Sequence, residues 1–297
     1  MNICISGSTG LVGRALVRTL QQRGEHVYPL HRAHATDARA LYWDPDTYTL
    51  ARPEELAKCA AVIHLGGTPI AGRWSAARKE LIHASRTTST HQLARQLAAL
   101  ASPPPVWLVA SAIGFYGSRG ETVLTEEATA GAGFLADVCR EWEAAAAPAR
   151  AAGIRVVHLR FGMLLDPAGG ALKAMLPAFS CGLGGALGSG QQYMSWATLE
   201  DAIRAILFIL DHHECTGPIN ITAPTPCTNH DFTKALGQAL RRPTWARVPA
   251  TLARWVFGEM ADALLLASQR VLPAKLNQAG FTFDHPDIAT AFAALIK

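Results

Sequence analysis

The stretch MNICISGSTGLVGRAL, residues 1–16, decides the fold of this 297-residue chain. An apolar run, Asn2–Ser6, is typical of a buried β-strand, and the pattern of Val12–Gln22 is typical of a helix. Glycines at 7, 10 and 13 lie where the two meet, and a turn without side chains lets backbone N–H groups and the helix N-terminus approach a pyrophosphate. The spacing G-x-x-G-x-x-G is one residue longer in its first gap than the dinucleotide-binding fingerprint, and packing alone is the alternative role of these glycines. We expect the phosphate-binding turn to consist of Gly7, Ser8, Thr9, Gly10, Leu11 and Val12.

The end of the second apolar run, His26–Leu30, bears on the kind of nucleotide. His31 and Arg32 follow it, and the next carboxylate is Asp37. Dehydrogenases that prefer NAD place an acidic residue here for the ribose 2′-hydroxyl, whereas a guanidinium suits a 2′-phosphate. We therefore predict NADP as the cofactor, the alternative being that Arg32 is a solvated loop residue.

Apolar runs alternate with helical patterns through the first half of the chain. The further runs are Ala61–Leu65, Val106–Ala110 and Ile154–Leu159, and the helical stretches include Ala76–Leu100 and Leu135–Ala151. This alternation predicts an α/β fold, a Rossmann-type doubly wound parallel sheet with helices on both faces. From about Asp166 glycines and prolines become frequent and the strand signals weaken. We predict an NADP-binding domain over residues 1–165 and a smaller α/β substrate-binding region over residues 166–297, with a strand near 217–223 returning to the main sheet.

The composition limits the possible partners. With 49% apolar and 17% charged residues the chain is a folded globular protein, and its basic residues, net charge +4, are scattered rather than clustered as in a nucleic-acid site. The six cysteines show neither a C-x-x-C pair nor metal-ligand spacing, so we expect reduced thiols and no metal. The N-terminus lacks a basic region before its apolar stretch, and the uncharged run Ala174–Leu199 is broken by Pro177 and by glycines. We expect a cytoplasmic protein with a small-molecule substrate and neither nucleic acid nor membrane as a partner.

Several further motifs, in their order and spacing, resemble the extended short-chain dehydrogenase/reductase superfamily. Within it, the chain is most similar to the poorly characterised subfamily called NAD-dependent epimerase/dehydratase-like. The motifs that carry the resemblance are GSTGLVG, HLGGTPIAGRW, ASRTTST, SAIGFYG, CREWEAAA, LRFGMLL, GLGGALGSGQQYMSW, GPINITAPTP and LLLASQRVLPAKLNQAGFTF, which together span essentially the whole chain.

The resemblance implies contacts to the cofactor along the chain. His31 and Arg32 are expected to border the adenosine ribose, and Leu65 and Gly66 to line its adenine side. Arg86 lies on a helix that passes beside the cofactor in this subfamily, and Leu164, in the segment 162–164, is expected near the nicotinamide. Core packing for Leu65 and a solvated helix charge for Arg86 are the alternatives.

The resemblance also raises a question about catalysis. Members of the superfamily usually use a Ser or Thr with a Y-x-x-x-K motif, whose lysine lowers the pKa of the tyrosine. Ser111 matches the serine, the alternative being a hydroxyl that caps the strand end. On the helix containing FLADVCREWEAAA, however, Leu135 and Cys139 stand at the tyrosine and lysine positions.

Tyr116, in GFYG, is the nearest candidate for the missing acid/base. In extended relatives a tyrosine here commonly shapes the pocket, which is the alternative. Arg160 leaves two placements open, one facing the pocket and one paired with a buried carboxylate. We predict Ser111 and Tyr116 as the catalytic residues.

These features together predict an NADP-dependent oxidoreductase or epimerase of the extended short-chain type with an atypical site. Its expected substrate is an unidentified small polar molecule. The alternative is a sensor or regulatory protein that binds NADP without turnover. By analogy with the superfamily we expect a homodimer.

Overall fold

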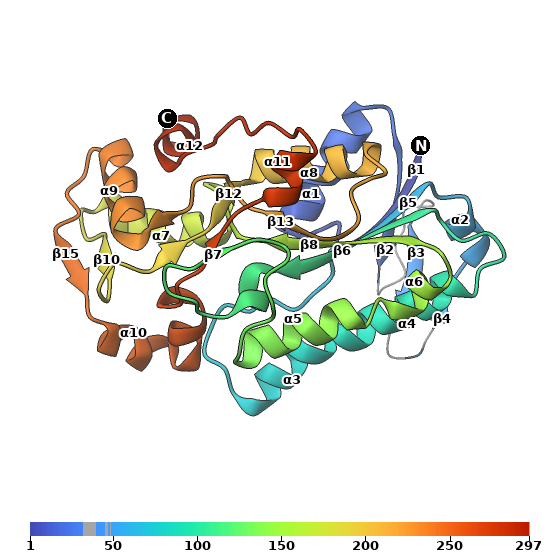
Figure 1. The fold of residues 1–297 in the computed structure, drawn as a ribbon, viewed down its shortest axis with the longest axis horizontal. Helices are drawn as coiled ribbons and strands as arrows, with labels where there is room; N and C mark the ends of the chain where they lie inside the picture. Colours follow the sequence, from blue (N-terminus) through green and yellow to red (C-terminus); the bar gives the residue numbers. More distant parts are fainter. Residues whose placement is uncertain (32–39, 45–46, 48, 297) are drawn as a thin grey trace.

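A mostly parallel sheet of eight strands runs through the centre of the molecule (Figure 1). The structure is a computed structural model that describes residues 1–31, 40–44, 47 and 49–296. The strand order is β13 (Gly217–Ile221), β8 (Arg155–Phe161), β6 (Val106–Ala112), β5 (Ala61–His64), β1 (Asn2–Ser6), β2 (His26–His31), β3 (Leu41–Asp44) and β4 (Thr49–Leu50). Among these strands only the pair of β3 and β4 is antiparallel. The predicted doubly wound α/β fold is confirmed.

Helices cover both faces of the sheet. One face carries α1 (Leu11–Gln22), α8 (Leu199–Asp211) and α11 (Ala274–Gln278), and the other carries α2 (Pro53–Ala57), α4 (Thr87–Ala98), α5 (Phe134–Ala144) and α6 (Ala147–Ala151). The helix α3 (Ala76–Ala84) leads into α4. Successive strand residues point to opposite faces, so Ile3 and Ile5 belong to the first apolar cluster and Cys4 to the second. Burial on both faces explains why the strands are apolar throughout.

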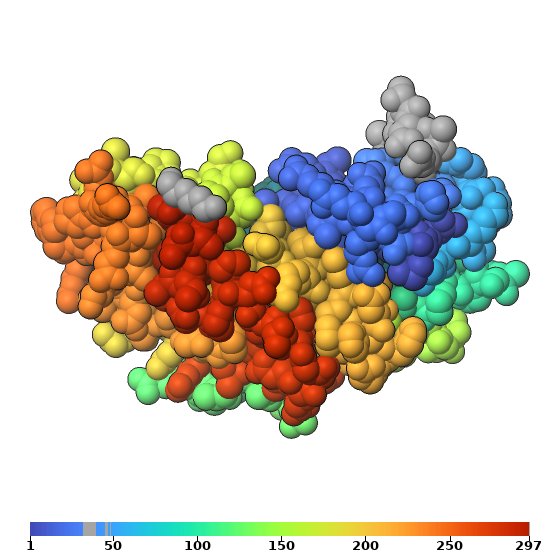
Figure 2. All heavy atoms as spheres, turned by 90° about the horizontal axis from the view of Figure 1, so that it is seen from above, coloured from blue at the N-terminus to red at the C-terminus, as the bar shows by residue number. Residues whose placement is uncertain are grey.

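A smaller group of elements packs beside the carboxyl edge of the sheet. It comprises α7 (Gly170–Ser180), α9 (Asn229–Leu240), α10 (Ala250–Phe257), α12 (Ile288–Leu295) and the strand pairs β9 (Met163–Asp166) with β12 (Trp196–Thr198), β10 (Gly185–Leu187) with β15 (Ala246–Val248), β11 (Tyr193–Met194) with β14 (Cys227–Thr228), and β7 (Val123–Leu124) with β16 (Arg270–Val271). Seen from above, the orange and red residues of the C-terminal part fill one half of the molecule and the blue N-terminal residues the other (Figure 2). Within the described residues, none of the helices has the length and apolar character needed to cross a membrane.

His158 on β8 gives the fold a dependence on pH. Its side chain is buried, and its Nε2 lies 3.1 Å from Nη2 of Arg150, which can only donate, so the imidazole accepts there and is neutral. Burial, with the nearby Arg150 and Arg160 cations, lowers the pKa of His158 from 6.5 to about 4. Between these two values the unfolded chain binds a proton that the folded chain does not, so the free energy of unfolding falls as the pH decreases through this window.

We expect this effect to remove about 2–3 kcal/mol between pH 7 and about 4.5. Urea unfolding at both pH values measures it, and His158→Asn is expected to lose most of that difference. His26→Asn, at an exposed strand position, is the control that keeps the wild-type difference. An unchanged pH dependence in His158→Asn would show that other groups cause it.

Candidate functional site

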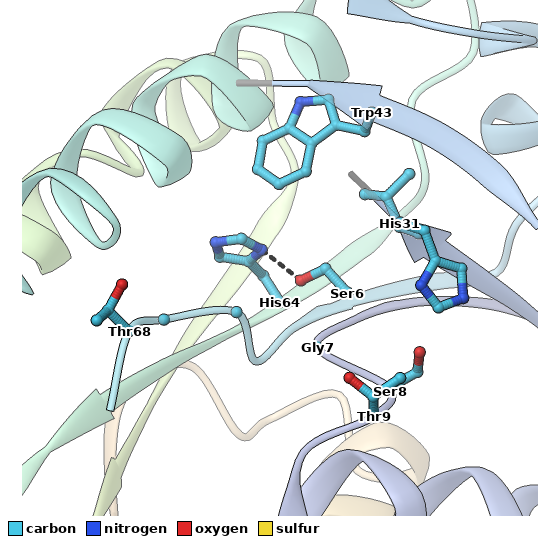
Figure 3. A pocket seen from close by; sticks show the side chains of 11 residues that line it. Ser6, Gly7, Ser8, Thr9, His31, Trp43, His64 and Thr68 are labelled. Carbon is cyan, nitrogen blue, oxygen red and sulfur yellow. Dashed lines mark hydrogen bonds between the residues drawn. The ribbon is translucent and has the colours of Figure 1, made fainter. Parts of the chain in front are cut away.

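A pocket of about 270 Å³ opens at the carboxyl ends of β1, β2 and β5 (Figure 3). Its wall includes Ser6, Gly7, Ser8, Thr9, Gly66 and Gly67. The sheet is built outward in one direction from β1 to β2 and in the other from β1 to β5, so the strand order reverses at this point. Ligands of doubly wound folds bind at such a reversal.

The turn between β1 and α1 leaves no room for a side chain at Gly7 or at Gly13. Gly7 has a φ of +71°, and a Cβ there would lie 2.8 Å from the backbone carbon of Leu65. A Cβ on Gly13 would meet the carbonyl oxygen of Gly7 and lie 2.8 Å from Cα of Ser8. Gly10, the residue before α1, has no side chain with which to cap the first N–H groups of the helix. The turn therefore fits a phosphate group held by backbone N–H donors.

The polar side chains around this pocket are hydroxyls and imidazoles. The polar ones are Ser6, Ser8, Thr9, His31, His64 and Thr68, and no carboxylate is among the described residues that form the wall. Ser6 Oγ and His64 Nδ1 are 2.6 Å apart, and the His64 ring meets the edge of Trp43 at a centroid distance of 5.6 Å (Figure 3). A wall without carboxylates among its described residues suits an anionic ligand.

The structure brings together part of the predicted cofactor-binding set. The predicted residues in the pocket wall are Gly7, Ser8, Thr9, His31 and Gly66, and Gly10 continues the turn. Leu11, Val12, Leu65 and Leu164 pack against the apolar cluster that includes Ile3. Arg32 lies outside the described residues.

Arg86 lies behind the pocket wall, between α3 and α4. Its half-buried guanidinium donates from Nη2 to the carbonyl oxygen of Thr68 and from Nη1 to that of Ile82, each at 3.0 Å. Gly67 packs so close that a Cβ there would lie 3.4 Å from Cζ of Arg86. Arg86 therefore lies beside the pocket, as predicted from the resemblance, and its hydrogen bond to Thr68 fixes the segment that follows β5.

Ser111, at the end of β6, belongs to a buried polar network. Its hydroxyl donates to Oε1 of Glu143 at 2.8 Å, and Arg160 donates to both carboxylate oxygens, from Nε at 2.7 Å and from Nη2 at 2.8 Å. The Arg160 side chain is 3% exposed and that of Glu143 13%. Of the two placements that the sequence left open for Arg160, the structure has the pair with a buried carboxylate.

Tyr116 extends this network and is fully buried. Its hydroxyl accepts from Nη1 of Arg160 at 2.9 Å and donates to Oδ1 of Asn220 at 2.7 Å. Burial raises the pKa of Tyr116, although Arg160 opposes the rise. The guanidinium of Arg160 also stacks 3.6 Å from the ring centroid of Phe115. This geometry favours the pocket-shaping alternative for Tyr116 over the acid/base role.

The helix α5 carries neither member of the usual motif. Leu135 and Cys139 face Gly114, where a Cβ would lie 3.5 Å from Cβ of Leu135 and 3.6 Å from Sγ of Cys139. Burial raises the pKa of the Cys139 thiol to about 12, so the thiol is protonated at neutral pH. The residues at these two positions therefore supply no acid/base group.

Tyr116→Phe is expected to lower the free energy of unfolding by about 1–3 kcal/mol, because it leaves a buried donor of Arg160 and a buried acceptor of Asn220 unpaired. Urea unfolding measures this loss. The matched control is Tyr193→Phe, since the Tyr193 hydroxyl makes no hydrogen bond to any described residue, and its expected loss is below about 0.5 kcal/mol. Equal stability of the two variants would contradict the hydrogen bonds assigned to Tyr116.

Four residues near these sites were not predicted from the sequence: Trp43, His64, Thr68 and Glu143. His64 and Thr68 lie within the quoted HLGGT segment, so their position after an apolar run was a usable signal. Glu143 comes four residues after Cys139 and so lies on the same face of α5. Trp43 sits on the short strand β3, whose alternation over four residues is too brief to stand out.

Comparison with known proteins gives matches over the whole chain. The sequence model of the family described as "NAD dependent epimerase/dehydratase family" matches residues 3–222, and that of a domain of unknown function, DUF1731, matches residues 248–295. An epimerase family protein of Mycobacterium bovis is 43% identical over 291 residues, which cover 97% of this chain and 95% of that protein. The epimerase family protein YfhF of Bacillus subtilis is 35% identical over 299 residues, covering 100% and 98%.

Two solved structures have a similar fold along the entire chain. Human epimerase family protein SDR39U1 (isoform 2), crystallised with NADPH, has a TM-score of 0.89 at 27% identity and covers 100% of this chain and 99% of its own. The nucleoside-diphosphate sugar epimerase of Corynebacterium glutamicum has a TM-score of 0.81 at 36% identity and covers 100% of this chain and 58% of its own. With its glycine turn at the reversal of a doubly wound sheet, this chain belongs to the NAD-dependent epimerase/dehydratase family.

Proposed function

We propose that this protein binds NADP(H) at the β1–α1 turn and acts as an NADP-dependent oxidoreductase or epimerase on a small polar substrate. The observation that carries the proposal is the turn itself, where Gly7 and Gly13 leave no space for a Cβ and the pocket wall holds no carboxylate among its described residues. The human relative with NADPH supports the same cofactor. Homodimer formation and a cytoplasmic location stay predictions.

Different residues of the site would contact different parts of the cofactor. The turn from Gly7 to Val12 would hold the pyrophosphate through backbone N–H groups, and His31 with Arg32 would border the ribose that carries the 2′-phosphate. Leu65 and Gly66 would line the adenine side, Leu164 would lie near the nicotinamide, and Arg86 would lie beside the cofactor. When bound, the nicotinamide supplies hydride transfer.

Ser111 is the residue we propose to orient the substrate. Its single proton is donated to Glu143, so its oxygen offers lone pairs to a substrate hydroxyl. Tyr116 would act as a positioning residue, because its hydroxyl joins Arg160 to Asn220 and thereby fixes the network that holds Ser111. The proton exchanged during turnover would then be supplied or accepted by a group of the substrate itself or by a water molecule.

A second function is a sensor that retains NADP(H) without turnover. The observation that favours it is the pair of side chains at positions 135 and 139, where Leu and a protonated Cys replace the usual Tyr and Lys. Turnover separates the two functions. Consumption of NADPH by substoichiometric protein with any sugar, ketone or aldehyde of a panel would exclude the sensor.

The first test is a fluorescence titration with NADPH and with NADH. We expect NADPH to bind roughly 10–100-fold more tightly, because a charge-assisted contact to the 2′-phosphate is worth about 1.5–3 kcal/mol. Arg32→Ala is expected to abolish this preference while NADH binding stays unchanged. Equal or absent binding of the two nucleotides to the wild-type protein would remove the basis of the proposal.

A further inference from the structure

The guanidinium of Arg86 has no acidic partner in the described part of the chain. It donates to three neutral oxygens, the carbonyls of Thr68 and Ile82 and, at 3.4 Å, the hydroxyl of Ser85. Burial lowers the pKa of Arg86, and the charge of Arg78 lowers it further. The carbonyl oxygens and the nearby Trp142 ring stabilise this half-buried cation in part, but no carboxylate among the described residues neutralises its charge, so an anionic ligand would be favoured beside it.

Arg86 also has hydrogen-bond donors to spare. A guanidinium carries five N–H groups, and the three contacts to Thr68, Ile82 and Ser85 use one from Nη2 and two from Nη1. Among the residues that the structure describes, Nε–H and the second Nη2–H of Arg86 donate to no acceptor. The site thus retains donors for oxygens that the protein itself does not provide.

The position of Arg86 places this charge next to the motif position that lacks lysine. Its Cζ lies 5.1 Å from the ring centroid of Trp142, three residues after Cys139 on α5. It is close enough to Cys139 for its charge to lower the pKa of that thiol. The cation comes from the start of α4 rather than from α5, but both helices pack on the same face of the sheet.

The order of the strands assigns Arg86 to one end of the cofactor. His31 ends β2 and Trp43 lies on β3, whereas Arg86 lies against Gly67, after β5, and against α5, which follows β6. From β2 to β6 there are three strand spacings, roughly 14 Å in all. A dinucleotide that places its 2′-phosphate at the β2 end would therefore extend its other half toward Arg86.

We propose that Arg86 supplies from α4 the positive charge that a lysine at position 139 would supply from α5, and that it binds the nicotinamide half of NADP(H). The inference rests on the proposed function, because it presupposes that NADP(H) is the ligand. Under this proposal Arg86 is a cofactor-binding residue. Its positive charge comes from the start of α4 and not from α5, but it lies at the nicotinamide end of the site in both cases.

Binding of two ligands tests the proposal without any substrate. The first is NADPH, and the second is 2′,5′-ADP, which carries the adenosine half and the 2′-phosphate alone. We expect Arg86→Met to weaken NADPH binding on the order of 10–100-fold and to change 2′,5′-ADP binding by less than about twofold. Arg95→Met, an exposed position on the same helix, is the matched control and is expected to bind both ligands like the wild type.

Relocating the charge is the second arm of the test. In the Arg86→Met background, Cys139→Lys is expected to recover at least about tenfold of the lost NADPH affinity. Should Arg86→Met fail to fold, Arg86→Gln keeps amide donors for Thr68 and Ile82 without the charge and carries the same comparison.

The outcomes separate the two hypotheses. Wild-type protein that binds neither ligand overturns the proposed function and with it the inference. Wild-type binding together with unchanged NADPH affinity in Arg86→Met overturns the inference alone. An equal loss of both ligands, or no recovery with Cys139→Lys, also overturns it, because Arg86 would then serve the adenosine half or the fold.

Discussion

Gly13→Ala is expected to eliminate NADPH binding and to lower the free energy of unfolding by about 2–3 kcal/mol. The added Cβ would meet the carbonyl oxygen of Gly7 and lie 2.8 Å from Cα of Ser8. Both are backbone atoms, so no rotamer change can make room. The turn cannot move away either, because Gly7 already lies against the backbone of Leu65, where even a Cβ on Gly7 would lie 2.8 Å from the Leu65 carbonyl carbon. The turn must therefore open, and its backbone N–H groups no longer point together toward the phosphate.

Gly10→Ala is the matched control in the same turn. Among the described residues, a Cβ there would have only the carbonyl oxygen of Gly7 within 4 Å, at 3.3 Å, and the backbone φ of −74° suits alanine. We expect NADPH binding to persist and the free energy of unfolding to fall by no more than about 1 kcal/mol. Urea unfolding and NADPH titration of both variants measure the difference. Wild-type NADPH affinity in Gly13→Ala would show that the ligand does not depend on the shape of the turn.

Arg160→Met is expected to lower the free energy of unfolding by about 3–5 kcal/mol. The substitution removes the two-point contact of Arg160 with the carboxylate of Glu143, which then keeps only the Ser111 hydroxyl as a hydrogen-bond donor among the described residues. It also removes the cation from the ring of Phe115 and the donor from the hydroxyl of Tyr116. A buried charge without its partner is among the most destabilising changes a core can undergo.

An exposed ion pair on α5 provides the control for this substitution. Arg140 and Asp137 lie 2.9 Å apart with about half of each side chain exposed, so Arg140→Met is expected to change stability by less than about 0.5 kcal/mol. The double variant Arg160→Met/Glu143→Leu is expected to be more stable than Arg160→Met alone, because it removes the unpaired carboxylate as well. Urea unfolding compares all three. A loss in Arg160→Met no larger than in Arg140→Met would contradict the ion pair.

Much of the fold could be predicted from the spacing of apolar residues along the sequence, but the points at which a helix is interrupted could not. The run Asn2–Ser6 forms β1 over the same residues, since a strand buried on both faces is apolar throughout. The stretch Ala76–Leu100 reads as one helix but forms α3 and α4. Ser85, at the break, donates to the carbonyl of Ile82 and accepts from the backbone N–H of Thr68, bonds that depend on the segment after β5.

The site shows the same division between local and long-range information. The glycine turn could be predicted because strand, turn and helix follow one another within 16 residues. The partner of Arg160 could not, because it depends on β6 and β8 pairing with Ser111 opposite Arg160, and on α5 packing so that Glu143 reaches both. No spacing in the sequence encodes that register.

The apolar cluster on one face of the main sheet joins the two ends of the chain. Leu276 and Phe281, near the C-terminus, pack in the same cluster as Ile3 and Leu16. Asn220 ties the segment after β16 to the network around Ser111, donating from Nδ2 to the carbonyl of Leu272 at 2.9 Å. Shortening the chain before Leu272 would therefore uncover the core that supports the nucleotide turn. We therefore expect the two regions matched by separate family models to unfold in one cooperative transition, and a chimera that exchanges one of them between relatives to be less stable than either parent.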